Sequence, residues 1–250
     1  MHRILEKGNV NWGKALAATL AATLAVGGAA LAAAESAVTA ATDKIKDLTC
    51  TLRVVKTDFN ELGKISKDFS RSYYFKRMDI TYQFPNKTRL QTKAVGMSGT
   101  LIFNGNTRYY KLPIRSETKD LTGQPGQKQS LLQLGVFSKD FLALDYEPVF
   151  VKKEGKLEVF RLNQRNTDNK SYEMVWVNPT THIIEKRLSY NGESKLRMET
   201  RYKEAREIRP GIFLPTRIEV YNQFGKLGGI QNLEEIKVNQ GVDEKLFETK

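Results

Sequence analysis

Alternation between apolar and polar residues is the main pattern of the chain after residue 50. It is clearest over residues 195–203, where Leu196, Met198, Thr200 and Tyr202 alternate with Lys195, Arg197, Glu199, Arg201 and Lys203. Because successive side chains of a strand point to opposite faces, this segment predicts a strand with one dry face and one wet face.

Further segments rich in β-branched and aromatic residues show the same period. They predict strands over 99–105, 107–112, 156–162, 171–178, 181–190, 214–223 and 228–238, with three or four more between 50 and 95. Turn sequences such as Asn60-Glu61-Leu62-Gly63, Asn104-Gly105 and Asn191-Gly192 separate them. Long, twisted strands in an antiparallel meander tend to curl. We therefore expect a mainly β fold, a half-open antiparallel β-barrel of about eleven strands.

Residues 35–48 follow a helical period instead. Val38, Ala41, Ile45 and Leu48 are spaced three or four residues apart in an Ala-rich context. This spacing predicts one amphipathic helix ahead of the first strand.

One long segment, 113–146, interrupts the strand pattern. It begins with a polar, turn-rich stretch and then becomes strongly apolar, with Leu131, Leu132, Leu134, Val136, Phe137, Phe141, Leu142 and Leu144. Ser138 is a typical N-cap and predicts a short second helix after it. A long, partly helical insertion with an apolar face suits a lid over the mouth of a barrel. The same segment is equally well suited to be a plug that fills the barrel core.

The N-terminus has the parts of a secretory signal peptide. Three basic residues among the first 14 lead into a weakly apolar run over 15–31, and alanines occupy 32–34. We expect cleavage before Glu35, which leaves 35–250 as one soluble periplasmic domain. The alternative is a retained membrane anchor, although the run is short and rich in Ala, Gly and Thr. Cys50 lies too far downstream to be the lipid-modified first residue of a lipoprotein.

The chain is strongly basic, with 40 Lys and Arg residues against 28 Asp and Glu residues and a net charge of +12. Such a charge usually suggests a nucleic-acid partner. An exported protein meets anionic lipid head groups, lipopolysaccharide and acidic proteins instead. We therefore expect an anionic membrane surface as a partner, and no nucleic acid.

Residues suited to catalysis or metal binding are sparse. Beyond residue 34 the sequence has one histidine, His182, and one cysteine, Cys50, so a His/Cys zinc cluster cannot be assembled. It contains no G-x-S-x-G elbow, no P-loop and no dinucleotide-binding fingerprint. We expect a protein that is not an enzyme, with no catalytic residue, metal or cofactor, in which Cys50 is a small buried hydrophobe.

Apolar residues on the expected dry faces are the candidate ligand-binding positions. They form an apolar lumen and its lid: Leu101, Phe103, Leu131, Leu132, Leu134, Phe137, Phe141, Leu142, Met174, Trp176, Leu196 and Met198. Such a lumen suits acyl chains, which bind through non-directional apolar burial. The same residues would also suit an ordinary packed core.

Four short motifs follow one another along the domain. They are PNKTR at 85–89, IFNGNTRYY at 102–110, GIFLPTRI at 211–218 and VDEKLF at 242–247. Together with the opening helix, the first hairpin and the helical insertion, they resemble the LolA-like superfamily of periplasmic carriers that sort outer-membrane lipoproteins. The resemblance implies an incomplete barrel whose apolar lumen receives the acyl chains of a lipoprotein, or another lipid, from an inner-membrane exporter. An outer-membrane acceptor would then take the cargo.

One position departs from this resemblance. In the known carriers an Arg precedes the Pro-Asn step and bonds to the lid, whereas Phe84 stands there in this sequence, with Lys87 and Arg89 nearby. The resemblance therefore implies a lid and leaves its control open. The long insertion also leaves the cargo open. Envelope-stress sensors of the same fold bind a membrane anti-sigma factor, and that role is the alternative function.

Overall fold

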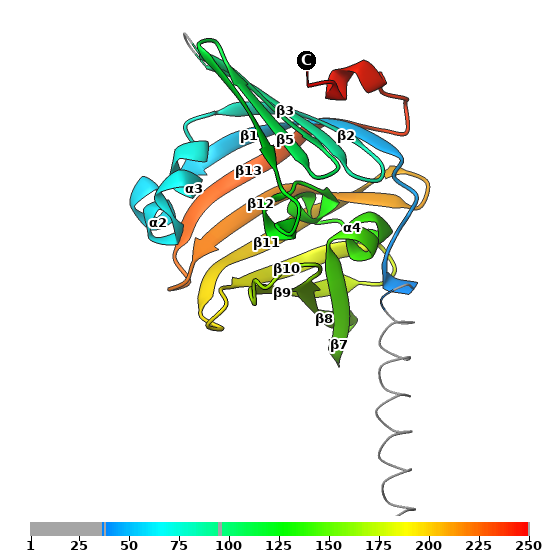
Figure 1. Cartoon of the computed structure of the whole chain (residues 1–250). Coiled ribbons are helices and arrows are strands. Elements are labelled where there is room, and N and C mark those ends of the chain that lie inside the picture. Colours follow the sequence, from blue (N-terminus) through cyan, green and yellow to red (C-terminus); the bar gives the residue numbers. More distant parts are fainter. Residues whose placement is uncertain (1–36, 38, 95–96, 250) are drawn as a thin grey trace, which may run out of the picture.

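A single antiparallel sheet of thirteen strands forms the body of the protein (Figure 1). The computed structural model describes residues 37, 39–94 and 97–249. The strand order is β6-β5-β4-β3-β2-β1-β13-β12-β11-β10-β9-β8-β7. The end strands β6 and β7 do not pair with each other, so the curved sheet is a half-open barrel, as expected.

The strands follow one another as a meander. They are β1 (Asp47–Thr57), β2 (Arg77–Gln83), β3 (Lys87–Ala94), β4 (Met97–Asn104), β5 (Thr107–Leu112), β6 (Arg115–Asp120), β7 (Tyr146–Glu154), β8 (Leu157–Gln164), β9 (Tyr172–Asn178), β10 (Ile183–Tyr190), β11 (Leu196–Arg209), β12 (Ile212–Asn222) and β13 (Leu227–Val238). Strands β11, β12 and β13 contain 14, 11 and 12 residues, beyond the usual five or six. This length confirms the expectation of long, curling strands.

The two strands beyond the expected eleven are the edge strands β6 and β7. Strand β6 has the sequence RSETKD and is exposed at five of its six positions, so no hydrophobic alternation marks it. Because these strands take up both ends of the expected 113–146 insertion, the connection between them shortens to residues 121–145.

The expected helix over 35–48 is wrong for most of its length. Among the described residues of this segment, helix ends at Ala40, and Asp47 already begins β1. Ile45 and Leu48 are buried in the core nevertheless. They reach it from extended chain, whose backbone bonds elsewhere: the Thr42 amide donates to the Phe137 carbonyl at 2.9 Å. Apolar spacing alone does not distinguish these two conformations.

The expected turn at residues 60–63 is also wrong. The segment forms α2 (Phe59–Ile65), and α3 (Lys67–Ser72) follows it. The Asp58 side chain accepts hydrogen bonds from two backbone amides of the first turn of α2, and Ser66 caps α3 in the same way. These caps outweigh the local turn preference of Asn and Gly. No helix among the described residues is long and apolar enough to span a membrane.

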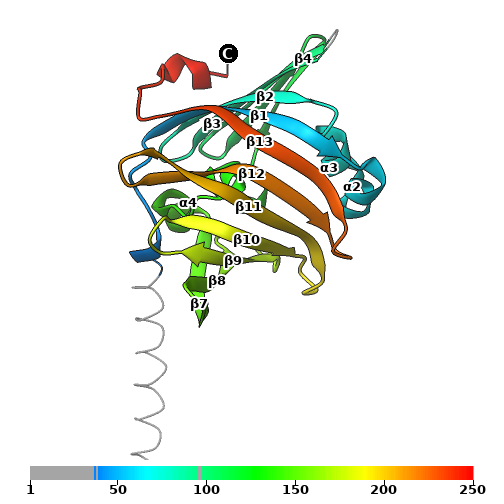
Figure 2. The ribbon, with the colours of Figure 1, turned by 180° about the vertical axis from the view of Figure 1, so that it is seen from behind.

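The concave face of the sheet is mainly apolar and is the core of the domain. Directly paired residues share a face: Leu48 pairs with Tyr82, and Phe160 with Val175. The buried cluster includes Leu48, Cys50, Ile80, Tyr82, Phe160, Leu162, Val175, Tyr202, Leu214, Ile218, Val220 and Leu233. Figure 2 shows the sheet from behind, with α4 visible beyond it. The segment between β6 and β7 therefore lies on the concave side.

Candidate functional site

The connection between β6 and β7, residues 121–145, is called the insertion below. It contains two 3₁₀ helices, η1 (Pro125–Gln127) and η2 (Leu131–Leu134), and the helix α4 (Lys139–Leu144). Seven of its apolar side chains are at most 8% exposed and belong to the core cluster: Leu131, Leu132, Leu134, Val136, Phe137, Phe141 and Leu142. Leu144 is 40% exposed. The insertion is thus packed into the barrel.

Aromatic rings join the insertion to the strands beside it. The ring of Phe137 stacks on Phe160 of β8 with centroids 5.1 Å apart. Phe141 makes edge-to-face contacts with Phe137 at 5.9 Å and with Tyr146 of β7 at 6.1 Å. Such contacts add about 0.5–1.5 kcal/mol each beyond area burial. They hold α4 against the β7–β8 side of the barrel.

A buried hydrogen bond joins the insertion to the other half of the sheet. The Tyr82 hydroxyl of β2 donates to Asp140 Oδ2 of α4 at 2.6 Å. Asp140 is 3% exposed and also accepts from the Ser138 hydroxyl. Burial raises the pKa of Asp140, although the bonds from Ser138 and Tyr82 oppose that shift. Ser138 occupies the expected N-cap, but its side chain bonds to Asp140 and caps no backbone amide.

This bond lies close to the position where the resemblance implies an arginine. The position expected to hold an Arg contains Phe84, and Tyr82, two residues earlier on the same side of the turn, reaches the insertion instead. Backbone hydrogen bonds add further attachment: the Phe137 amide donates to the His182 carbonyl at 2.8 Å, and the Ile184 amide donates to the Gly135 carbonyl at 2.8 Å.

Gly135 permits close packing between the insertion and β11. Its φ is +79°, and a Cβ built there would lie 2.4 Å from Cδ1 of Tyr202. With no side chain in the way, the Tyr202 ring lies against the backbone, and its hydroxyl donates to the Leu132 carbonyl at 3.1 Å. Any larger residue would push the insertion off this strand.

Little apolar space remains beneath the insertion. A void of about 20 Å³ lies between η2 and strands β2 and β3, lined by Ile80, Leu90, Leu131 and Leu134 among others. That volume has room for about one water molecule, so this void admits no acyl chain. The insertion itself occupies the expected lumen.

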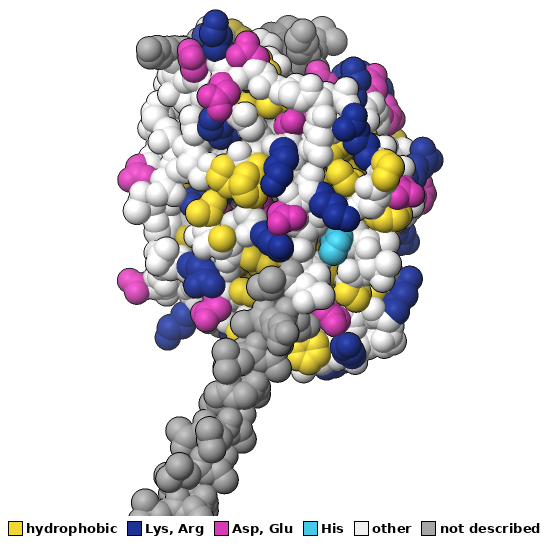
Figure 3. Space-filling view, turned by 90° about the vertical axis from the view of Figure 1, so that its right-hand side faces the viewer, with side chains coloured by type: hydrophobic (Ala, Val, Ile, Leu, Met, Phe, Trp, Pro, Cys, Tyr) yellow, Lys and Arg dark blue, Asp and Glu magenta, His cyan; other side chains and the backbone are white. Residues whose placement is uncertain are grey.

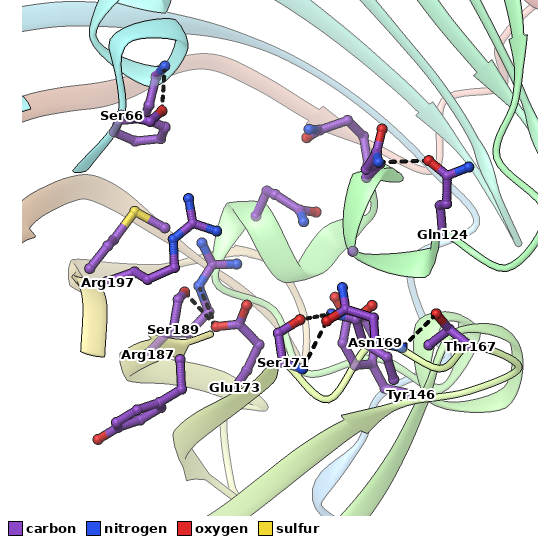
Figure 4. Close-up of a pocket in the computed structure, with 18 of the residues that line it drawn as sticks. Ser66, Gln124, Tyr146, Thr167, Asn169, Ser171, Glu173, Arg187, Ser189 and Arg197 are labelled. Atoms are coloured by element: carbon purple, nitrogen blue, oxygen red, sulfur yellow. Dashed lines mark hydrogen bonds and ion pairs between the residues drawn. The ribbon is translucent and has the colours of Figure 1, made fainter. Parts of the chain in front are cut away.

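A larger, polar cavity of about 510 Å³ lies beside it (Figure 4). Glu173 of β9 and Arg187 of β10 line it from the sheet, with Arg187 Nε 3.9 Å from Glu173 Oε2. The Arg187 side chain is 9% exposed, and the Ser189 hydroxyl donates to Glu173 Oε2 at 2.6 Å. Burial raises the pKa of Glu173, while Arg187 and Ser189 act against the rise. This cavity was not predicted from the sequence. The feature that could have indicated it is a charged residue at an inward-facing position in each of two neighbouring strands, Glu173 in β9 and Arg187 in β10.

Two of the candidate lumen residues lie on the outer face of the sheet. In β9, Val175 and Val177 face the core, so Met174 and Trp176 face outward. Trp176 Nε1 donates to Glu154 at 3.2 Å, and the Lys186 ammonium lies 3.6 Å from the ring centroid. This segment, YEMVWV, is apolar on both faces, so alternation alone does not identify the inner one.

The other strand candidates have mixed positions. Phe103 is buried and shares a face with Thr88, whose hydroxyl bonds to the insertion at the Gln129 carbonyl. Leu101 lies on that face too and is partly exposed. Met198 packs against the core cluster and lines the polar cavity, whereas Leu196 is outside both. The ligand-binding role of the candidates stays a prediction.

Comparison with solved structures identifies the fold. A LolA superfamily protein from Nitrosomonas europaea matches with a TM-score of 0.57 and 16% identity over 88% of this chain and 97% of its own. A putative outer membrane lipoprotein-sorting protein domain from Vibrio parahaemolyticus matches with a TM-score of 0.57 and 12% identity over 87% of this chain and 95% of its own. A DUF1329 family protein from Desulfovibrio piger matches with a TM-score of 0.55 and 12% identity over 88% of this chain and 97% of its own. No family model and no curated protein matches the sequence. The chain has a LolA-like fold.

Proposed function

We propose that the protein is a periplasmic carrier that holds the acyl chains of a lipoprotein, or of another lipid, on the concave face of the barrel and carries them toward the outer membrane. The observation that carries the proposal is the position of the seven buried apolar side chains of the insertion. They belong to a connection between the two edge strands, so the insertion can leave the apolar wall without separating any pair of neighbouring strands. The LolA-like fold supports this reading.

In this mechanism the insertion closes the empty barrel and cargo displaces it. Burying a large apolar side chain contributes about 1.5–3 kcal/mol, so the seven together contribute about 10–20 kcal/mol before the opposing cost of ordering the insertion, which leaves a much smaller net closing free energy. A buried acyl chain of about 16 carbons offers about 12 kcal/mol, at about 0.8 kcal/mol per CH₂. One or two chains therefore match the apolar burial that the insertion supplies, which makes exchange between lid and cargo reversible.

The proposed function requires export from the cytoplasm. We propose that residues 1–34, which lie outside the described residues, act as a cleavable signal, so that the carrier works as residues 35–250 in the periplasm, between an inner-membrane exporter and an outer-membrane acceptor. N-terminal sequencing of the protein from a periplasmic fraction should find Glu35 or a close neighbour. An intact Met1 on membrane-bound protein would contradict this.

We expect contact with anionic membranes to be weaker than the net charge of the chain suggests. On β11, Arg201 pairs with Glu199 at 2.5 Å and Lys203 with Glu219 at 2.8 Å. Acidic side chains lie among the basic ones on the face in Figure 3. We propose a salt-sensitive membrane encounter of modest strength. Vesicle co-sedimentation should show more binding to anionic than to neutral lipid, and equal binding would refute it.

The test of the carrier function starts from protein purified without detergent. Mass spectrometry of an organic extract should find a lipid or acylated molecule that is absent from an unrelated periplasmic protein purified in parallel. Addition of N-phenyl-1-naphthylamine, an uncharged hydrophobic fluorophore, should give saturable binding that an acylated peptide reverses. No extracted lipid together with no saturable binding would leave an ordinary packed β domain.

A further inference from the structure

The polar cavity adjoins the space that acyl chains would occupy. Gln129 and Gln133 of the insertion line both the 510 Å³ polar cavity and the small apolar void under η2. The two spaces are therefore adjacent along the segment that contains η2. A molecule whose apolar chains replaced the insertion on the wall would therefore place its other end against the strands that line the polar cavity, beside Arg187 and Arg197.

Arg187 places a buried guanidinium group, incompletely hydrogen-bonded, in the wall of this cavity. The residue lies on the concave face, where it pairs with Val175 and Thr200 on the neighbouring strands, and it is 8% exposed. Its Nε has no hydrogen-bond partner, because Glu173 Oε2 is 3.9 Å away. Burying a guanidinium is costly unless its donors are bonded. Arg187 lines the cavity, so an anion bound there would be a charged partner for its guanidinium group.

A second arginine reaches the cavity through a β-bulge. Along β11 the register skips one residue, because Ser189 pairs with Met198 and Tyr190 with Leu196, so Arg197 is the extra residue. A bulge redirects the side chain of its extra residue. Arg197 lines the cavity, and Figure 4 shows its side chain beside Arg187 and Glu173. The cavity thus holds two guanidinium groups against one carboxylate.

We propose that the polar cavity binds the phosphate-bearing head group of the carried lipid, through Arg187 and Arg197. Guanidinium groups match phosphate oxygens in geometry and charge, and bonds between charged groups are stronger than neutral ones. The surplus of positive charge favours an anion over an uncharged head group. This inference rests on the proposed carrier function and adds the chemical class of its cargo.

The experiment compares two lipids with the same chains. Dioleoyl phosphatidic acid and dioleoylglycerol, delivered from cyclodextrin, compete with N-phenyl-1-naphthylamine for the full mature chain, and glycerol 3-phosphate is tested as the soluble head group. The variants are Arg187→Gln, Arg197→Gln and the control Arg206→Gln, which removes an exposed arginine from the same strand outside this cavity. The double variant Arg187→Gln/Glu173→Gln removes both buried charges. It replaces Arg187→Gln in the experiment if the single variant does not fold.

The expected result is a preference of about tenfold or more for phosphatidic acid over dioleoylglycerol. Loss of either cavity arginine should remove most of that preference and leave dioleoylglycerol binding unchanged, while Arg206→Gln changes neither. Equal affinity of the wild-type protein for both lipids would overturn the head-group site and leave the carrier function standing. If neither lipid binds, both the head-group site and the carrier function are refuted. Binding of glycerol 3-phosphate as tight as that of phosphatidic acid would assign the cavity to soluble phosphate esters instead.

Discussion

Replacing Phe141 and Leu142 by Ser tests whether the insertion opens as a separate unit. Phe141 is 1% exposed and contacts Phe137 and Tyr146, and Leu142 is 8% exposed. In a solid core, truncation costs about 3–5 kcal/mol for Phe and about 2–5 kcal/mol for Leu, so about 5–10 kcal/mol together. That loss is comparable to the whole free energy of unfolding of a typical domain, about 5–15 kcal/mol. A plug would therefore unfold with its barrel.

A separate lid gives a different result, because the destabilisation is limited by the free energy that closes it. We expect the double variant to keep its β circular dichroism and a cooperative thermal transition. Hydrogen exchange should lose protection at the amides of Phe137 and Ile184, which bond across the boundary of the insertion. Binding of N-phenyl-1-naphthylamine should rise, because the apolar wall is exposed.

The matched control is Leu144→Ser in the same helix, since Leu144 is 40% exposed. It should leave stability, exchange and probe binding near the wild-type values. Loss of the sheet signal in the double variant, with no probe binding in either protein, would refute the reasoning and assign the insertion to the core.

Three further predictions follow from single contacts. Tyr82→Phe should lower the free energy of unfolding by about 1–3 kcal/mol in denaturant titrations, because it leaves a buried Asp140 oxygen unbonded, whereas Tyr74→Phe at an exposed site should have no effect. Although burial raises the pKa of Glu219, hydrogen bonds from Lys203, Tyr221 and Arg217 lower it to about 2. The ionised Glu219 carboxylate therefore stabilises the fold fully above pH 4.5, and this stabilisation is lost as the pH falls toward 2. The free energies of unfolding of the wild-type protein and of Glu219→Gln should converge on acidification, and a constant difference between them would contradict this. Burial raises the pKa of Cys50 to about 12, so its reaction with a thiol reagent in folded protein should be limited by unfolding, and rapid labelling would disprove it.

Sequence periodicity was sufficient for the sheet and insufficient at its edges. The long strands β11, β12 and β13 each bury one face, so their residues record the fold directly. Strand β6 buries almost nothing, and its pairing with β5 rests on backbone hydrogen bonds that any sequence can make. Residues 35–48 show the converse: buried positions imitate a helical period although most of the chain there is extended.

The candidate site likewise has features that the sequence predicted and features that it did not. Burial of the insertion follows from its leucines and phenylalanines, whereas the choice between lid and plug depends on an equilibrium that a pattern of apolar residues does not encode. Met174 and Trp176 were assigned to the wrong face because both faces of β9 are apolar. The place of Arg197 depends on a one-residue bulge in β11, which strict alternation cannot anticipate.

The most direct test of the central claim is hydrogen exchange of the wild-type protein with and without a triacylated lipopeptide. If acyl chains displace the insertion, exchange should speed up on loading over residues 131–144 and at Ile184, whose amide bonds to Gly135, while the rest of strands β8 to β12 keep their protection. The soluble peptide without its acyl chains should change nothing. Bound lipopeptide with unchanged exchange over 131–144, or no binding of either the lipopeptide or dioleoyl phosphatidic acid, would contradict the account.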